Sequence, residues 1–105
     1  MRVTISHSRQ PDEVKQLVDR SLDDVFSSIA KGMVRVVDQQ KTWSGDTMSF
    51  AMNLKVGPLN APVRGFVAVT DHDVTIDADL GLLEKFAAQD GTKAAIESKV
   101  KGLLA

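Results

Sequence analysis

Residues 47–56 read TMSFAMNLKV, and this segment decides the fold class. Large apolar side chains occupy every second position, and small or polar side chains stand between them. Because successive side chains of a strand point to opposite faces of its sheet, this period of two predicts a strand with one buried face. The set expected in the core is Met48, Phe50, Met52, Leu54 and Val56, and the set expected toward solvent is Thr47, Ser49, Ala51, Asn53 and Lys55.

Strands are also expected before and after this segment. Trp43-Ser44-Gly45-Asp46 has the composition of a turn and joins it to an earlier strand that begins near Met33. Residues 57–62, GPLNAP, are expected to form a connection, because proline lacks the N–H that a central strand donates. Val3 and Ile5 mark a short first strand. Two later strands are expected. The first is expected to direct Val63, Gly65, Val67 and Val69 toward the core, and the second Val74, Ile76, Ala78 and Leu80.

The remaining segments have helical spacing. Pro11 has no N–H to lose and the next two residues are acidic, which favours the first turn of a helix that ends near Gly32. A second helix is expected from about Thr92. The apolar residues are Val14, Leu17, Val18, Leu22, Val25, Phe26 and Ile29 in the first helix, Leu82, Leu83 and Phe86 in a bend, and Ile96, Val100, Leu103 and Leu104 in the second helix. The apolar stripe of the second helix lies beside lysines, which is typical of a helix at a membrane interface and also of a helix packed on a sheet. We favour packing on the sheet.

Together these elements predict an α+β fold in a single domain, residues 1–105. Their order is strand, helix, four strands, helix, and the short turns imply an antiparallel sheet of about five strands. Both helices are expected on one face of the sheet. The opposite face is expected to be mostly polar and to carry Ser49, Asn53, Lys55, Arg64, Phe66, Ala68, Thr75, Asp77 and Asp79.

The overall composition excludes several classes of function. A hydrophobic share of 43% with 26% charged residues is typical of a globular protein, and the net charge of -1 gives no bulk attraction to nucleic acid. Without cysteine the chain forms no disulfide and no thiolate metal site. No apolar run has the length of a membrane helix, and the N-terminal residues do not resemble a signal peptide. We therefore expect a cytoplasmic protein without integral membrane association.

The two histidines offer little chemistry. Asp71-His72-Asp73 could hold a metal ion, but aspartates are favoured in tight turns, and a hairpin turn explains the run without an ion. His7, between the first strand and the first helix, is better placed for a structural hydrogen bond than for catalysis. We expect no catalytic, cofactor-binding or metal-ligating residues, and no enzyme activity.

Four side chains are candidates for contact with a partner or ligand: Trp43, Phe66, Asp77 and Asp79. The two aspartates are two apart on a strand and share a side, which suits paired carboxylates, although a nearby Arg64 or Lys55 would make them part of a cross-strand charge pair. The indole of Trp43 could be an exposed anchor, or it could cap the core beside Gly45.

A two-fold homodimer is also expected. Residues 47–56 contain no proline and only Lys55 as a charge, so at a sheet edge this strand would leave its N–H and C=O groups open to a second copy. Phe66 and Ala68 on the polar face offer a second possible contact. The 57–62 connection could instead cover the same edge.

The chain resembles the bacterial polyhydroxyalkanoic acid system proteins over nearly its whole length. The resemblance rests on His7, on Trp43-x-Gly45-Asp46 before a strand with Phe50, and on Gly65-x-Val67-x-Val69 before the acidic turn. Residues 80–83, Phe86 and the closing apolar stripe complete it. Asp90-Gly91-Thr92 departs from the shorter bend expected there. The resemblance carries no catalytic signature and implies a role linked to polyhydroxyalkanoate granules or their regulation.

Two functions remain open at this point. The first is a non-catalytic accessory protein of storage-polyester metabolism that binds a granule, a granule-associated protein or itself. The second is a carrier that holds a small apolar ligand between helix and sheet, as helix-grip folds do. Met33, Met48 and Met52 are adaptable side chains that suit either a filled core or a pocket wall.

Overall fold

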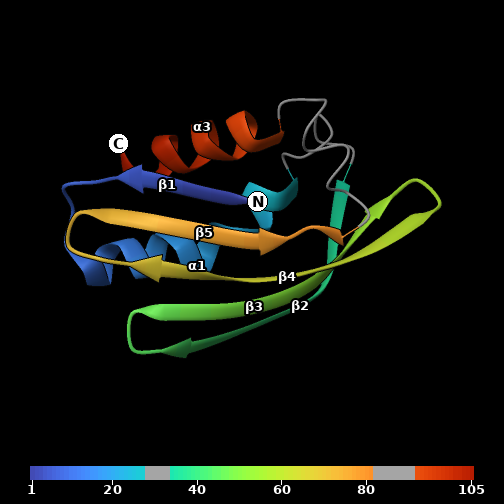
Figure 1. The fold of residues 1–105 in the computed structure, drawn as a ribbon, viewed down its shortest axis with the longest axis horizontal. Coiled ribbons are helices and arrows are strands. Elements are labelled where there is room, and N and C mark those ends of the chain that lie inside the picture. The colour runs from blue at the N-terminus through green and yellow to red at the C-terminus, as the bar shows by residue number, and fades with distance from the viewer. Residues whose placement is uncertain (28–33, 82–91) are drawn as a thin grey trace.

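The computed structural model describes residues 1–27, 34–81 and 92–105 (Figure 1). The elements follow the expected order, strand, helix, four strands and helix. They are β1 (Arg2–Ser6), α1 (Pro11–Ser27), β2 (Val34–Ser44), β3 (Thr47–Val56), β4 (Leu59–Val69), β5 (Asp73–Asp79) and α3 (Thr92–Leu104). Several predicted features lie outside the described residues: Ile29, the cap at Gly32, Met33, the bend with Leu82, Leu83 and Phe86, and Asp90-Gly91.

The five strands form an antiparallel sheet in the order β1-β5-β4-β3-β2. Strands β2 to β5 follow one another through hairpins, as short connections between antiparallel neighbours require. The first strand adds to the far side of β5, so β1 and β2 are the edges. This confirms the α+β class and the antiparallel sheet.

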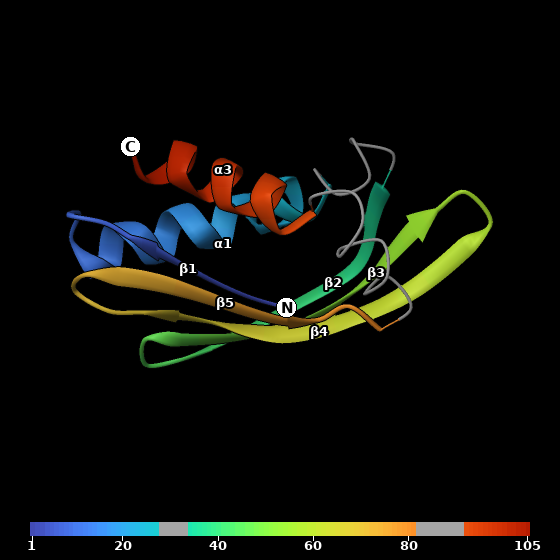
Figure 2. The ribbon, with the colours of Figure 1, turned by 45° about the horizontal axis from the view of Figure 1, so that its top comes forward.

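Both helices cover the same face of the sheet, and the sheet curves around them (Figure 2). The buried face of β3 carries Met48, Phe50, Met52 and Leu54, as the alternation predicted. The ring of Phe26 in α1 packs on the ring of Phe50, with centroids 5.3 Å apart. Burial of these rings and their neighbours holds the helix layer on the sheet.

The apolar stripe of α3 is part of this core. Ile96, Val100 and Leu104 are buried, and Leu103 packs against the same cluster. The stripe therefore packs against the rest of the protein, as we favoured. No described helix combines the length and apolar content that crossing a bilayer requires.

A bulge in β2 decides which of its side chains face the helices. The register with β3 shifts between Val37 and Gln40, and Asp38 there takes a left-handed φ of 55°. The extra residue changes the parity of the strand, so Val36 before the bulge and Trp43 after it both face the core side. A regular strand would turn Trp43 to the opposite face.

Two glycines lie at positions of the sheet that disfavour a residue with a side chain. Gly45 opens the two-residue β2–β3 turn with a φ of +60°, which a side chain rarely tolerates. Gly65 has a different role: a Cβ built there would lie 2.0 Å from the main-chain oxygen of Asp77. The close approach of β4 and β5 therefore requires a residue without a side chain at this position.

The prediction that residues 57–62 form a connection is wrong. The turn is confined to Gly57 and Pro58, and β4 begins at Leu59 with Pro62 opposite Asn53 of β3. Proline is tolerated here because β5 pairs with β4 only from Arg64 onward. Among the described strands, only β3 pairs with β4 at Pro62, so the missing N–H of the proline costs no ladder bond to β5.

Residues 47–56 do not meet the condition of lying at a sheet edge, on which pairing of this strand with a second copy depends. β3 lies between β2 and β4, and both neighbours pair with it along most of its length. The edge strand β2 is protected by its bulge and by Lys41, which points inward to the helix layer. The homodimer, through a sheet edge or through the open face of the sheet, stays a prediction.

Replacing Phe50 with Ala tests the one-sided burial of the sheet. We expect the free energy of unfolding to fall by about 3–5 kcal/mol, because the change removes the ring that packs on Phe26 and leaves a cavity. Leu59 is 45% exposed, so Leu59→Ala is the control and should cost about 0.5 kcal/mol or less. Urea denaturation of both variants measures the difference. A loss below about 1 kcal/mol for Phe50→Ala would contradict the assignment of this face to the core.

Candidate functional site

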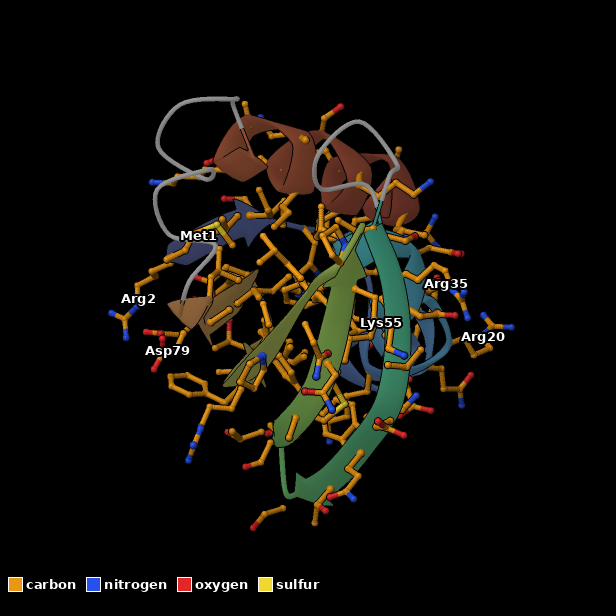
Figure 3. All side chains as sticks on the ribbon, turned by 90° about the vertical axis from the view of Figure 1, so that its right-hand side faces the viewer. Met1, Arg2, Arg20, Arg35, Lys55 and Asp79 are labelled. Atoms are coloured by element: carbon orange, nitrogen blue, oxygen red, sulfur yellow. The ribbon has the colours of Figure 1, made fainter. Side chains whose placement is uncertain are left out.

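The candidate site is the sheet face opposite the helices, which we call the open face. It carries side chains that the alternation directs away from the core, including Arg35, Lys55, Arg2 and Asp79 (Figure 3). The two basic residues Arg35 and Lys55 face each other across β2 and β3, whereas Arg2 lies on β1. The expected polar face is thus present, with cations toward two of its margins.

A shallow trough runs along β3 in the middle of the open face. It consists of two neighbouring hollows of about 460 Å³ and about 330 Å³ that share Gln40, Ala51 and Arg64. Small side chains on β3 form its floor, and longer ones on β2 and β4 form its walls. We use the name trough for Gln40, Thr42, Ser49, Ala51, Arg64 and Phe66 at one end, with Asp38, Asn53 and Pro62 at the other end.

The polar groups of the larger hollow are nearly all able to donate hydrogen bonds. Gln40, Thr42, Ser49 and Arg64 line it, and no carboxylate does. All four are exposed, and none has a hydrogen bond or ion pair with another side chain among the described residues. At the other end the Asp38 carboxylate accepts a hydrogen bond from the Asn53 amide at 3.3 Å. The trough therefore presents donors that the fold itself does not use.

Phe66 and the two aspartates lie in adjacent positions on this face. Phe66 is opposite both Ser49 and Asp77, and it is half-buried. The Asp77 carboxylate accepts a hydrogen bond from Arg2 Nε at 3.0 Å, so the charge partner is on β1 and is neither Arg64 nor Lys55. Arg2 is well exposed, and such an ion pair contributes little stability.

Asp79 has a local structural contact. Its Oδ1 accepts the main-chain N–H of Gly81 at 3.0 Å, just past the end of β5. Asp77 and Asp79 share one face, as predicted, but each has a separate partner. Within the described part of the chain, no contact joins the carboxylate oxygens of these two aspartates.

Trp43 is held at the junction between β2 and α1. Its Nε1 donates a hydrogen bond to Asp19 Oδ1 at 3.1 Å. Lys41 Nζ donates a hydrogen bond to the main-chain oxygen of Asp19 at 2.5 Å. Lys15 Nζ lies 5.9 Å from the centroid of the indole and pairs with Asp46. The half-buried indole packs against the core cluster. Of the two roles considered for Trp43, this geometry matches the core cap.

The histidine and aspartate run at residues 71–73 forms a hairpin turn. Thr70 Oγ1 accepts the main-chain N–H groups of His72 and Asp73 at 3.1 Å and 2.9 Å. His7 is tied to the same turn, since its Nε2 lies 2.9 Å from the Thr70 main-chain oxygen. Its Nδ1 accepts the N–H of Arg9 at 3.1 Å, so Nε2 must be the donor to Thr70. Within the described ranges, no group of three His, Asp or Glu side chains is placed to hold a metal ion.

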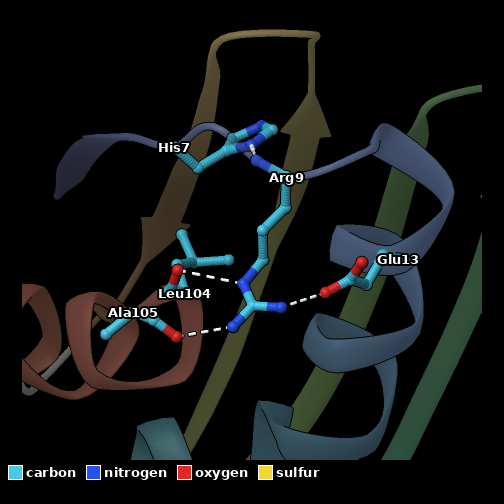
Figure 4. Close-up of polar contacts among 5 residues, drawn as sticks. All are labelled: His7, Arg9, Glu13, Leu104 and Ala105. Carbon is cyan, nitrogen blue, oxygen red and sulfur yellow. Dashed lines mark hydrogen bonds and ion pairs between the residues drawn. The ribbon is translucent and has the colours of Figure 1, made fainter.

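Arg9 joins the end of α3 to the start of α1 (Figure 4). Its Nε and Nη2 donate hydrogen bonds to the main-chain oxygens of Leu104 and Ala105, at 3.0 Å and 2.5 Å, and Nη1 pairs with Glu13. The last carbonyl groups of a helix lack intrahelical partners and carry partial negative charge, which a guanidinium satisfies. Arg9 is thus a cap for α3.

Sequence reasoning missed both Arg9 and the trough. No periodic signal relates residue 9 to residues 104 and 105, because that contact exists only in the folded protein. A signal for the trough was present, since Ser49, Ala51 and Asn53 are the small members of the solvent-facing set on β3. Their position between two strands with longer side chains required the strand order.

The fold and the site define a class: a small α+β protein with helices on one face of an antiparallel sheet and an exposed, donor-rich trough on the other. The chain belongs to the polyhydroxyalkanoic acid system family, because the family model described as "Putative polyhydroxyalkanoic acid system protein" matches residues 1–104. Comparisons with curated proteins and with solved structures gave no match.

Removing the Arg9 cap should loosen the contact between the helices. We expect Arg9→Ala to lower the free energy of unfolding by about 1–2 kcal/mol, because charge-assisted hydrogen bonds are lost from partly exposed carbonyl groups. Amide hydrogen exchange in the last turn of α3 should become faster. Arg20→Ala is the matched control, since the described contact of Arg20 is a 3.4 Å bond to the Gln16 main-chain oxygen. Equal effects of the two substitutions would contradict the capping role.

Proposed function

We propose that this protein is a non-catalytic, cytoplasmic accessory protein of polyhydroxyalkanoate metabolism that binds the storage-polyester granule through the open face of its sheet. Family membership supports the metabolic context. The binding mode is supported by the open face, where the half-buried Phe66 lies beside exposed, unused donors on a surface that neither described helix covers.

The observation that carries this proposal is the contrast between engaged polar groups near the helices and unengaged polar groups in the larger hollow. Near the helices, Arg9, Asp19 and Lys41 are engaged in contacts that hold elements together. In the larger hollow of the open face, Arg64 and Thr42 have no such partner among the described side chains. Groups that do not serve the fold are available to a ligand.

Co-sedimentation with native polyester granules tests the proposal. We expect wild-type protein to sediment with washed granules and Phe66→Ala to bind about five- to tenfold more weakly, because truncation of a central aromatic contact typically costs more than about 1 kcal/mol. Leu59→Ala removes an exposed apolar side chain at the β3–β4 hairpin and is expected to leave binding unchanged. Circular dichroism checks that both variants are folded.

Granules stripped of protein by protease separate two targets of binding. Retained binding after this treatment indicates the polyester itself, which the proposal requires, and loss of binding indicates a granule-associated protein. Sedimentation of the wild-type protein no greater than that of an unrelated control protein of similar size would reject the proposed function.

A further inference from the structure

We propose that the trough along β3 binds a single extended segment of the polyester chain, with its ester carbonyl groups accepting hydrogen bonds from Arg64, Gln40 and Ser49. This inference rests on the proposed function and specifies its ligand as a neutral 3-hydroxyalkanoate ester chain. It concerns recognition of one polymer strand and not of a granule surface as a whole.

The dimensions of the trough fit one chain. Its walls stand on β2 and β4, which lie two strand spacings apart, or about 10 Å. A chain midway between them is about 5 Å from each wall, which exceeds the contact distance of about 3.5–4.0 Å between non-bonded carbon atoms, so one chain fits. Two chains side by side would need three such gaps, more than about 10 Å. From Ser49 to Asn53 the floor extends over four residue steps, about 14 Å. The combined shape is long and narrow, as an extended polymer segment requires.

The hydrogen-bonding groups of the larger hollow suit an ester chain, whose carbonyl groups only accept hydrogen bonds. An internal ester unit has a carbonyl oxygen that accepts hydrogen bonds and no N–H or O–H that donates one. The larger hollow offers the guanidinium of Arg64 with the amide of Gln40 and two hydroxyl groups, and it has no carboxylate. A bound peptide would also bring N–H donors, and the hollow provides no charged acceptor for them.

The apolar part of the hollow suits the rest of the repeating unit. Phe66 forms one wall and Ala51 lies on the floor, so alkyl side groups of the polymer can contact them while the carbonyl groups face Arg64. Apolar surface with a few well-placed polar groups is the usual composition of a ligand site. The second hollow continues this path past Asn53 and Pro62.

Capped oligomers provide a direct test. The probe is a tetramer of 3-hydroxybutyrate with an acetylated hydroxyl end and a methyl-ester carboxyl end, which has no charge and no donor. Titration into the full chain, followed by amide NMR shifts, is expected to perturb residues 40–42, 49–53 and 64–66. Arg64→Glu should weaken binding at least about tenfold, which is the effect of about 1.4 kcal/mol. Arg35→Glu makes the same charge change on the open face outside the trough and should leave binding within about twofold.

A steric variant tests the location independently of charge. Ala51→Phe is expected to fill the floor of the trough and abolish oligomer binding, and Ser6→Phe adds the same side chain on the exposed edge strand β1 without effect. Both positions are exposed, so both variants are expected to keep the wild-type circular dichroism spectrum.

The outcomes separate this inference from the proposed function. If the capped tetramer does not bind but wild-type protein sediments with protease-treated granules, the trough inference is overturned and the proposed function stands. If only tetramers with a free carboxylate bind, Arg64 recognises an anion, and ester recognition is overturned. If sedimentation equilibrium shows a dimer that Ala51→Phe dissociates, a second copy occupies the trough, which also overturns the inference.

Discussion

Burial of one sheet face against two helices is the constraint on which the rest of the structure depends. The rings of Phe26 and Phe50 meet at the centre of this contact, 5.3 Å apart, and the stripe of α3 closes the core from the side of β1. Because both described helices use the same face, neither of them covers the other face. The exposure of the trough is thus a direct consequence of how the core is formed.

Local departures from regular geometry serve this arrangement. The bulge at Asp38 turns Trp43 toward α1, where Asp19 accepts its N–H. Gly65 lets β4 and β5 approach closely behind the trough. Arg9 ties the end of α3 to α1 and so connects chain segments that are 95 residues apart. The contacts of Arg9 and Trp43 engage polar groups near the helices, whereas Arg64 and Thr42 in the larger hollow have no partner among the described side chains.

Family membership gives the open face a chemical context. A polyester of hydroxyalkanoic acids offers carbonyl acceptors and alkyl groups, and the larger hollow offers donors beside Phe66. The fold needs neither Arg64 nor Gln40 for its described contacts, so both can be replaced without disturbing the core. The proposed binding can therefore be tested with substitutions at these two positions that leave the described contacts of the fold in place.

The sequence by itself determined the order of the elements and the buried face of β1, β3, β4 and β5, whereas the bulge decided the faces of β2. Alternation of apolar side chains is a local property, and it correctly assigned Met48 to Leu54, Val63 to Val69 and Val74 to Leu80. Only the tertiary structure decided that Pro62 lies inside β4, that β3 is central, and that Arg9 caps α3. Each of these three features depends on which strand or helix lies beside the residue in the folded protein. Contacts between residues that are distant in the sequence leave no periodic signal in the sequence. The trough belongs to the second group for the same reason: its small and large side chains were visible in the chain, but their placement side by side required the strand order β4-β3-β2.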